Sequence, residues 1–253
     1  MITNLAIAFL FGSVIGSFLN VLIFRIPLRQ SIIFPPSHCT TCNHKLSVLD
    51  LFPLLSYLFL KGKCRYCKEK IKWHYPLVEL LSGFSFVWAF YSLGPSFLFL
   101  KVVFLTSILI VITFIDLEFM IIPDELTLGG SGIGLLFSLF DKSLLPSVLG
   151  GLAGAGIIYA IYLLGQLIYQ QETIGGGDIK MMLLIGIFIG IKSTLLAIFV
   201  AMMLGSIIGV ALIALRIKSR KDYIPFGPFL GAGCLIVIYF SKELVALYRA
   251  LVI

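Results

Sequence analysis

The amino-acid sequence predicts an all-α polytopic membrane protein with about eight transmembrane helices and one polar insertion near the N-terminus. Of its 253 residues, 60% are hydrophobic and only 12% are charged, whereas a soluble domain has roughly 25% charged residues. The mean hydropathy is +1.09. This composition excludes a soluble globular protein and indicates an integral membrane protein.

Apolar segments that can cross a bilayer, which takes roughly 17–25 residues for a helix, recur along the whole chain. The fourth, sixth and eighth of these segments are shorter than the others. We expect crossings at residues 2–24, 77–93, 97–115, 126–140, 144–168, 179–191, 194–215 and 226–240. The chain is thereby divided into a first transmembrane helix (1–24), a cytoplasmic loop (25–75) and a seven-helix core (76–253).

The positive charges predict which ends of these helices face the cytoplasm. Nine of the 19 Lys and Arg residues lie between Arg25 and Lys72, and four more lie in the connection 216–221. Because cytoplasmic loops carry an excess of Lys and Arg, we expect both segments inside and, with eight crossings, both termini outside. The net charge of +7 follows from this topology and gives no support to nucleic-acid binding.

The polar insertion contains two C-x-x-C motifs separated by 21 residues, formed by Cys39, Cys42, Cys64 and Cys67. Four thiolates at this spacing are typical of a closed, tetrahedral, structural zinc site. A reducing cytosol argues against two structural disulfides. A redox pair and buried thiols are the alternatives, and His38 or His44 beside the first motif could replace a ligand.

Two carboxylates stand where apolar segments meet polar connections. The segment 97–115 runs directly into Asp116, where the end of a helix is unfavourable for a negative charge. Asp178 follows three consecutive glycines, Gly175, Gly176 and Gly177, and precedes the apolar segment 179–191. Capping of a helix would explain Asp178 but would not require three glycines before it. The two acids are therefore candidates for a shared chemical role.

Both acids are expected on the cytoplasmic face, near the depth at which the helices emerge. If they converge, two like charges in a partly dry site cannot both ionise comfortably, so the pair retains one proton. Such a pair can activate a water molecule while donating a proton to the oxygen of an amide. The motifs H-E-x-x-H and G-x-S-x-G are absent from the sequence. The residues thus indicate peptide hydrolysis by an aspartate pair.

Other polar residues inside apolar segments have both functional and structural explanations. Asn20 and Glu79 are functional candidates because polar groups in a membrane are costly. Asn20 could instead make a hydrogen bond between helices, and Glu79 could pair with Arg25. Asp124 suits the start of the fourth helix. Small residues at 12–17 and 150–156 predict faces on which helices pack closely.

Taken together, these motifs resemble those of the type IV prepilin peptidases, over essentially the whole chain. Asp116 with the downstream Ile122-Pro123-Asp124-Glu125-Leu126 is similar to the first aspartate motif of that family. The second motif, G-x-G-D followed by x-K, is matched by Gly175, Gly177, Asp178 and Lys180. The segment 16–21 leading to Arg25, the two C-x-x-C motifs, and the segments 75–80 and 223–229 resemble the bacterial bifunctional branch.

The resemblance implies an eight-helix GxGD aspartyl protease whose catalytic pair is Asp116 and Asp178. Its supporting residues would be Gly175, Gly177, Lys180 and Asp124. The implied substrates are prepilins and pseudopilins of type IV pilus, type II secretion or competence systems, cut at the cytoplasmic face of the bacterial inner membrane. The cysteine-containing form also methylates the new N-terminus with S-adenosylmethionine. Our candidates for that second activity are Asn20, Arg25 and Glu79.

Three alternatives follow from the same residues. A peptidase without methyl transfer would keep the zinc loop as a scaffold, and the mass of one methyl group on the product separates it from the bifunctional enzyme. A membrane thiol oxidoreductase would need its cysteines on the oxidising side, whereas the charge pattern predicts them inside. A transporter with a proton relay would need its acids near the middle of the membrane, whereas these acids are predicted near helix ends.

Overall fold

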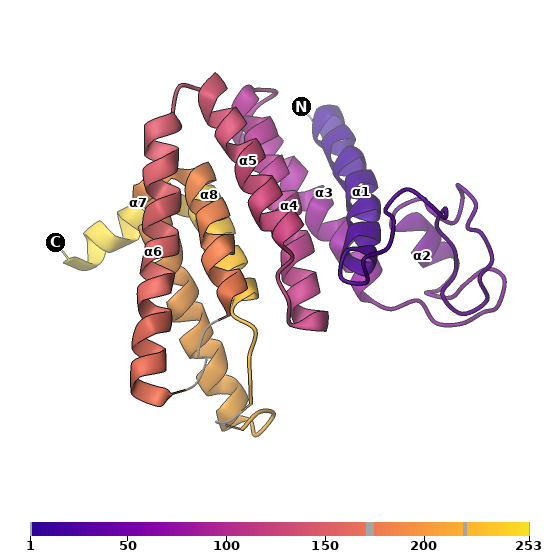
Figure 1. The fold of residues 1–253 in the computed structure, drawn as a ribbon. Coiled ribbons are helices and arrows are strands. Elements are labelled where there is room, and N and C mark those ends of the chain that lie inside the picture. Colours follow the sequence, from indigo (N-terminus) through magenta and orange to yellow (C-terminus); the bar gives the residue numbers. More distant parts are fainter. Residues whose placement is uncertain (1, 171–174, 220–221, 253) are drawn as a thin grey trace. The chain divides into compact units, whose positions relative to one another are not determined.

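The computed structural model describes residues 2–170, 175–219 and 222–252, and within these ranges the chain is helical with no strand (Figure 1). The helices are α1 (Ile2–Arg25), α2 (Leu55–Phe59), α3 (His74–Leu93), α4 (Phe97–Phe119), α5 (Asp124–Phe140), α6 (Leu144–Tyr169), α7 (Gly176–Ala214) and α8 (Gly227–Val252). Arg220 and Lys221, two basic residues of a connection predicted to be cytoplasmic, lie outside the described residues. The all-helical fold class is confirmed.

Most helices begin and end within a few residues of the predicted segments, but α8 continues to Val252, beyond the predicted end at residue 240, and one further difference matters for the site. The third predicted crossing ends at residue 115, whereas α4 continues through Phe119. The backbone N–H of Met120 still donates to the carbonyl oxygen of Asp116 at 3.0 Å. Asp116 therefore lies inside the last turns of α4, and the expectation that it follows the helix is wrong.

Two predicted crossings, 179–191 and 194–215, both fall within α7. Gly190 has a non-helical conformation there, with φ 73° and ψ 167°, which glycine adopts readily because it has no Cβ. A Cβ placed on Gly154 of α6 would lie 2.9 Å from Met182 O and 2.9 Å from Thr194 Cγ2. These two residues would be about 18 Å apart along a straight helix. We conclude that α7 doubles back at Gly190.

Among the described residues, five helices are long and apolar enough to cross a membrane: α1, α3, α4, α6 and α7. A shorter apolar helix covers Gly227–Phe240, and α5 has 17 residues. These lengths and compositions agree with a multi-pass membrane protein. The five long helices include α7 as a single helix, although it reverses at Gly190. The number of eight crossings therefore stays a prediction.

The chain divides into two compact units, Met1–Val111 and Ile112–Ile253, and the boundary lies within α4. In the first unit α1 packs along α3 through small side chains. A Cβ added to Gly16 would lie 2.7 Å from Glu79 Cα, and the Ser82 hydroxyl donates to Gly12 O at 2.7 Å. The predicted close-packing face of the first helix is thus confirmed.

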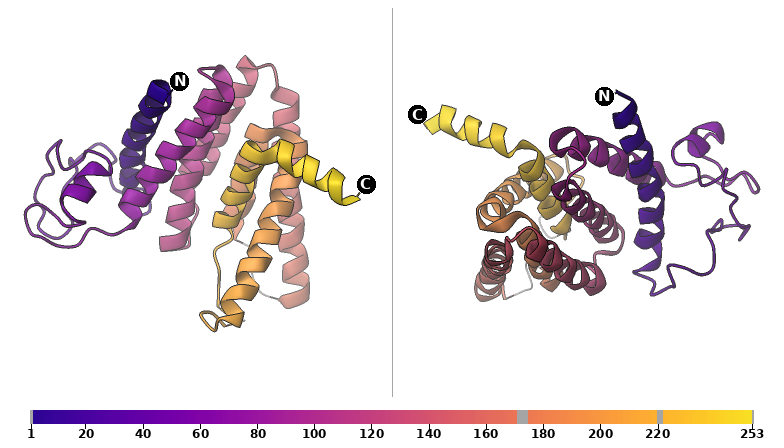
Figure 2. Two further views of the ribbon diagram at one scale, coloured as in Figure 1. Left: turned by 180° about the vertical axis from the view of Figure 1, so that it is seen from behind. Right: turned by 90° about the horizontal axis from the view of Figure 1, so that it is seen from above.

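The second unit contains the end of α4 and the helices α5 to α8. Gly154 in the glycine-rich stretch of α6 faces α7, as described above, and α8 also packs on α7. A Cβ on Gly233 of α8 would lie 2.6 Å from Ala197 O. Phe240 leaves the helical conformation, and beyond it α8 turns away from the other helices of this unit (Figure 2). The contact at Gly233 therefore places the part of α8 before Phe240 against α7.

Candidate active site and metal centre

Asp116 projects from the last turns of α4 toward the first residue of α8. Its carboxyl oxygen Oδ2 accepts a hydrogen bond from the backbone N–H of Gly227 at 3.1 Å, and the residue is only 5% exposed. A Cβ on Gly227 would lie 2.6 Å from that same oxygen. A side chain at position 227 would therefore displace the carboxylate, so glycine permits this contact.

Asp178 lies in the first turn of α7, which Gly175 caps. Its Oδ2 accepts from the backbone N–H of Gly175 at 3.1 Å, so the capping role expected as an alternative is part of the structure. Capping occupies only one oxygen, however. The other, Oδ1, is buried without a hydrogen-bond partner in the described part of the chain, and the residue is 3% exposed. Because an unpaired buried acceptor costs stability, this atom is a candidate for binding a substrate or water.

The structure brings Asp116 and Asp178 to one site, where the two carboxylates interact electrostatically. Both carboxylates also affect the phenol of Tyr223. Burial raises the pKa of Tyr223, and the charges of Asp178 and Asp116 raise it further. The side chain of Ile122 lies close to both Gly177 of α7 and Gly227 of α8. A Cβ on Gly177 would lie 2.7 Å from Ile122 Cβ, so the start of α7 packs directly on this side chain.

A surface ion pair joins the two predicted aspartate motifs. Pro123 is the N-cap of α5, and Asp124 is its first residue. Lys180 Nζ lies 2.7 Å from Oδ1 and 2.8 Å from Oδ2 of Asp124. The two side chains are 41% and 54% exposed, and exposed pairs of this kind contribute about 0–1 kcal/mol. The pair positions the start of α7 beside the start of α5 but does not touch either buried carboxylate.

The four cysteines of the polar insertion also come together. Their sulfur atoms lie within 4.8 Å of one another, and Cys39 Sγ is 3.8 Å from Cys67 Sγ. In a tetrahedral site with metal–sulfur bonds of about 2.3 Å, the sulfur atoms are about 3.8 Å apart. The donor set and its spacing therefore fit a four-coordinate metal.

Backbone hydrogen bonds in the first C-x-x-C motif affect the pKa of its first thiol, that of Cys39. The N–H of Cys39 donates to His44 O, and its carbonyl oxygen accepts from Asn43 N. Burial raises the pKa of the Cys39 thiol, but hydrogen bonds from the backbone of Cys42 and Thr41 outweigh this effect and lower it to about 6. The thiolate of Cys39, which is the metal-binding form, is thus favoured. At Cys67 a backbone hydrogen bond from Glu69 lowers the pKa, but burial and hydrogen bonds with the other three cysteines outweigh it and raise the pKa.

The second motif repeats this backbone pattern. The N–H of Cys64 donates to Glu69 O, and its carbonyl oxygen accepts from Lys68 N. Lys68 has φ 61°, like Asn43 with φ 54° at the same position of the first motif. A β-bridge flanks each motif in the same register, between His38 and Lys45 and between Lys63 and Lys70. The centre is therefore made of two copies of one local turn.

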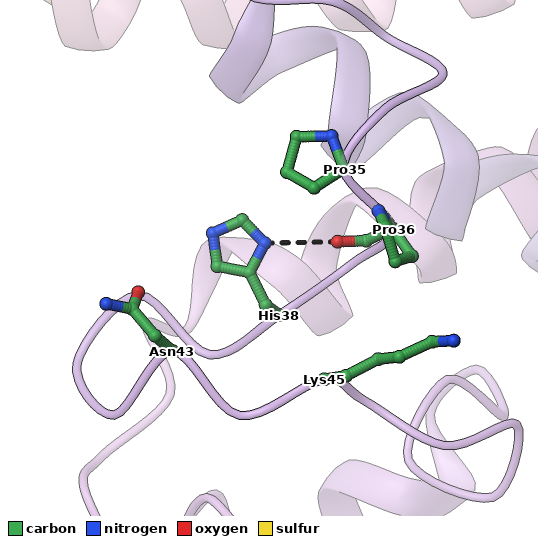
Figure 3. A pocket seen from close by; sticks show the side chains of 5 residues that line it. All are labelled: Pro35, Pro36, His38, Asn43 and Lys45. Carbon is green, nitrogen blue, oxygen red and sulfur yellow. Dashed lines mark hydrogen bonds between the residues drawn. The ribbon is translucent and has the colours of Figure 1, made fainter.

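Neither histidine beside the first motif joins the cluster. His38 Nδ1 is 3.0 Å from the carbonyl oxygen of Pro36, at the edge of a shallow pocket that also includes Asn43 and Lys45 (Figure 3). The His44 ring stacks on Tyr66 with 3.6 Å between ring centroids. Among the described residues, the only group placed to hold a metal consists of the four cysteines.

Sequence reasoning missed Asp50, which braces the metal centre. Its carboxylate accepts from Ser47 N and Oγ at 3.0 and 2.7 Å, from Arg65 Nε at 2.6 Å, and from Tyr66 Oη at 3.1 Å. Burial raises the pKa of Asp50, but the bonds from Ser47 and Arg65 hold it well below its ordinary value. Since Arg65 and Tyr66 lie between Cys64 and Cys67, Asp50 ties the second motif to the preceding loop. No sequence pattern marks this contact.

Arg25 and Glu79 bind backbone groups of the same loop. Arg25 donates to the carbonyl oxygens of Ser31 and Pro35 at 2.8 and 2.7 Å. Glu79 accepts from the backbone N–H of Leu54 at 2.8 Å. Both charged side chains thus anchor the loop to the ends of α1 and α3.

Asn20 joins the two helices of the first unit. Its Nδ2 donates to Tyr75 O at 3.1 Å, which matches the expected alternative of a hydrogen bond between helices. Its Oδ1 is buried and has no hydrogen-bond partner in the described residues. Of the three candidates for methyl transfer, Asn20 is therefore the one with a buried polar atom that has no partner in the described residues.

Comparison with known proteins identifies the family of this chain. Residues 10–93 match the bacterial peptidase A24 N-terminal domain, and residues 103–210 match the type IV leader peptidase family. The prepilin leader peptidase/N-methyltransferase of Aeromonas salmonicida (strain A449) is 34% identical over 275 residues, which cover 98% of this chain and 94% of the relative. The protein of the same name from Bacillus subtilis (strain 168) is 34% identical over 245 residues, with coverage of 96% and 97%. No solved structure matches the chain. The chain belongs to the type IV leader peptidase family.

Proposed function

We propose that this chain cleaves the leader peptide from type IV prepilins or pseudopilins and then N-methylates the residue that cleavage exposes. The observation that carries the proposal is the meeting of two buried carboxylates, Asp116 and Asp178, at the ends of two apolar helices. The names of the relatives, which cover nearly the whole chain, support both activities.

Cleavage would use the carboxylates as an acid–base pair that shares one proton. One carboxylate takes a proton from a water molecule, and the water oxygen attacks the scissile carbonyl carbon. The other, protonated, donates to the carbonyl oxygen. When the tetrahedral intermediate collapses, the C–N bond breaks and the leaving amine receives a proton from the pair. The backbone N–H groups of Gly227 and Gly175 hold Asp116 and Asp178 in place for these transfers.

The remaining predicted residues would support this pair. Gly177 allows Ile122 to pack against the start of α7, and Gly175 provides the capping N–H. The pair of Lys180 and Asp124 holds the two motifs in register at the surface. None of these four residues would exchange a proton with the substrate.

The metal centre would hold a structural zinc ion. Zinc favours four thiolates in a tetrahedron, and the sulfur spacing and the two matched turns support that choice. Elemental analysis of the purified protein would test it, with one zinc per chain expected. A different metal, or none in protein purified without chelators, would contradict it.

Methyl transfer would take place at the first unit, with S-adenosylmethionine as methyl donor. The donor supplies an electrophilic methyl group, and the chain would have to bind it and the new amino group. Asn20, through its unused Oδ1, is the candidate for such binding. Arg25 and Glu79 would act by holding the loop, since both bind its backbone.

The proposed location is the bacterial inner membrane, with the substrates inserted in the same bilayer and cut on the cytoplasmic side. The excess of Lys and Arg in 25–72 supports a cytoplasmic loop and external termini. In this arrangement 1–24 is a first crossing, 25–75 the metal-binding loop and 76–253 the protease core.

The mass of the product tests both activities together. Purified protein in lipid nanodiscs is incubated with a prepilin and S-adenosylmethionine, and the pilin is weighed intact. We expect loss of the leader and gain of one methyl group. Loss of the leader without methylation would leave a peptidase only, and an uncut prepilin would overturn the proposal.

A further inference from the structure

Tyr223 lies in the connection that leads into α8, four residues before Gly227, and it has a free hydrogen-bond donor. Its side chain is 46% exposed. Within the ranges that the structure describes, its hydroxyl makes no hydrogen bond. Asp178 Oδ1 is likewise unpaired. An unused donor and an unused acceptor therefore stand in the same site.

Gly175 lies close to both side chains. A Cβ on Gly175 would be 3.3 Å from Asp178 Oδ2 and 3.9 Å from the Tyr223 hydroxyl oxygen. The Tyr223 hydroxyl oxygen and Asp178 Oδ2, the oxygen that accepts from Gly175 N–H, are consequently no more than about 7 Å apart. A small group that bonds to an oxygen on each side spans about 5–6 Å. Since Gly175 has no side chain, no Cβ occupies the position near both oxygens, which leaves that position to a group that could bond to them.

The negative charges around Tyr223 keep its phenol hydroxyl protonated. Asp116 from α4 and Asp178 from α7 both act on the phenol, and after burial they are the causes that raise its pKa. The neighbouring Asp222 is engaged elsewhere, because it accepts from the backbone N–H of Ser219 at 2.7 Å. At neutral pH the phenol is therefore protonated and can donate.

We propose that the Tyr223 hydroxyl binds a carbonyl oxygen of the prepilin chain at the cleaved bond, across Gly175 from Asp178. This inference rests on the proposed peptidase function. In the reaction, the hydroxyl would donate a hydrogen bond to the oxygen on which negative charge develops, while the carboxylate pair moves the protons. Tyr223 keeps its own proton throughout, so the proton balance of the cleavage step is unchanged. Preorganised donors of this kind act mainly on the transition state.

Tyr223→Phe tests the inference by removing only the oxygen. Loss of one hydrogen bond to a developing oxyanion should lower kcat for prepilin cleavage about tenfold and leave KM nearly unchanged. The matched control is Tyr159→Phe in α6 of the same unit, whose exposed ring stacks on Tyr162. It should cleave within a factor of about two of the wild type.

A second measurement separates hydrogen bonding from packing. Fluorinated tyrosine, whose phenol ionises several pH units lower, is incorporated at position 223 or, as the control, at 159. At 223 it should shift the alkaline decline of cleavage to lower pH, because an ionised phenol cannot donate; at 159 it should not. An unshifted profile at 223, or a Tyr223→Phe variant as fast as the wild type, would overturn the inference. Inactive wild-type protein would instead overturn the proposed function itself.

Discussion

The metal centre and the aspartate pair are built in opposite ways. Each half of the metal centre is a local turn in which ligands three residues apart are oriented by the backbone of the next few residues, and the same turn occurs twice. The aspartate pair draws on α4, the connection before α5, the start of α7 and the start of α8. The first arrangement is encoded locally, whereas the second depends on how distant helices pack.

This difference predicts where each site is vulnerable. The metal centre should lose its metal when one of the four cysteines is removed, and should bind it more weakly when Asp50, which holds the loop, is replaced. The aspartate pair should fail when backbones can no longer approach one another, because glycines permit the contacts of Ile122 with α7 and of Asp116 with α8.

Among the variants that test this contrast, Gly177→Ala should give the largest effect. The new Cβ would lie 2.7 Å from Ile122 Cβ, so the start of α7 must shift, and a displacement of about 1 Å costs on the order of a hundredfold in rate. Gly176→Ala is the matched control, since nothing lies within 4 Å of its Cβ position. Cleavage rates and thermal unfolding of both variants are measured; similar rates would contradict the packing argument.

Removal of the metal should decrease methylation much more than cleavage. Cys42→Ser deletes one of the four sulfur ligands, so we expect loss of the bound metal and at least a tenfold decrease in methylation of a pre-cleaved pilin. Cleavage should decrease much less, because the residues around the aspartate pair all lie in the second unit. A parallel collapse of both activities would show that the two regions are not independent.

Asp50→Asn should weaken the metal centre moderately. The charge-assisted bond to Arg65 is lost, so we expect the metal affinity to fall severalfold at pH 7. Because the pKa of Asp50 is lowered in the folded chain, its stabilisation is complete above the ordinary carboxyl pKa and is lost as the pH falls below it. Competition with a chelator measures the affinity, and an unchanged value would remove Asp50 from this role.

Lys180→Met should have the smallest effect of the series. The ion pair with Asp124 is exposed on both sides, so its loss should cost no more than about 1 kcal/mol. Cleavage should decrease less than tenfold, and added salt should reduce the wild-type advantage, because salt screens exposed charges. A total loss of cleavage in a folded variant would mean that Lys180 contacts the substrate.

The same contrast explains what the sequence could predict. The helices and the four cysteines follow from local patterns, and the structure agrees with them. The continuation of α4 through Asp116 depends on packing between helices, whereas the reversal of α7 at Gly190 agrees with the two crossings predicted on either side of it. The contacts of Asp50 and Tyr223 also depend on packing: Asp50 belongs to no motif, and the resemblance of segment 223–229 to the family does not show what Tyr223 contacts. A G-x-G-D motif suggests a carboxylate at a helix start, but it does not show which phenol lies beside it.

The central claim, that Asp116 and Asp178 form one proteolytic pair, is tested most directly with Asp116→Asn and Asp178→Asn. Each variant receives intact prepilin and, separately, a leader-cleaved pilin with labelled S-adenosylmethionine. We expect both variants to remain folded, to lose cleavage by more than a thousandfold (on the order expected when a catalytic acid or base is removed), and to methylate the pre-cleaved pilin. Cleavage that survives either substitution would contradict the claim and leave Asp178 as the cap of α7 alone.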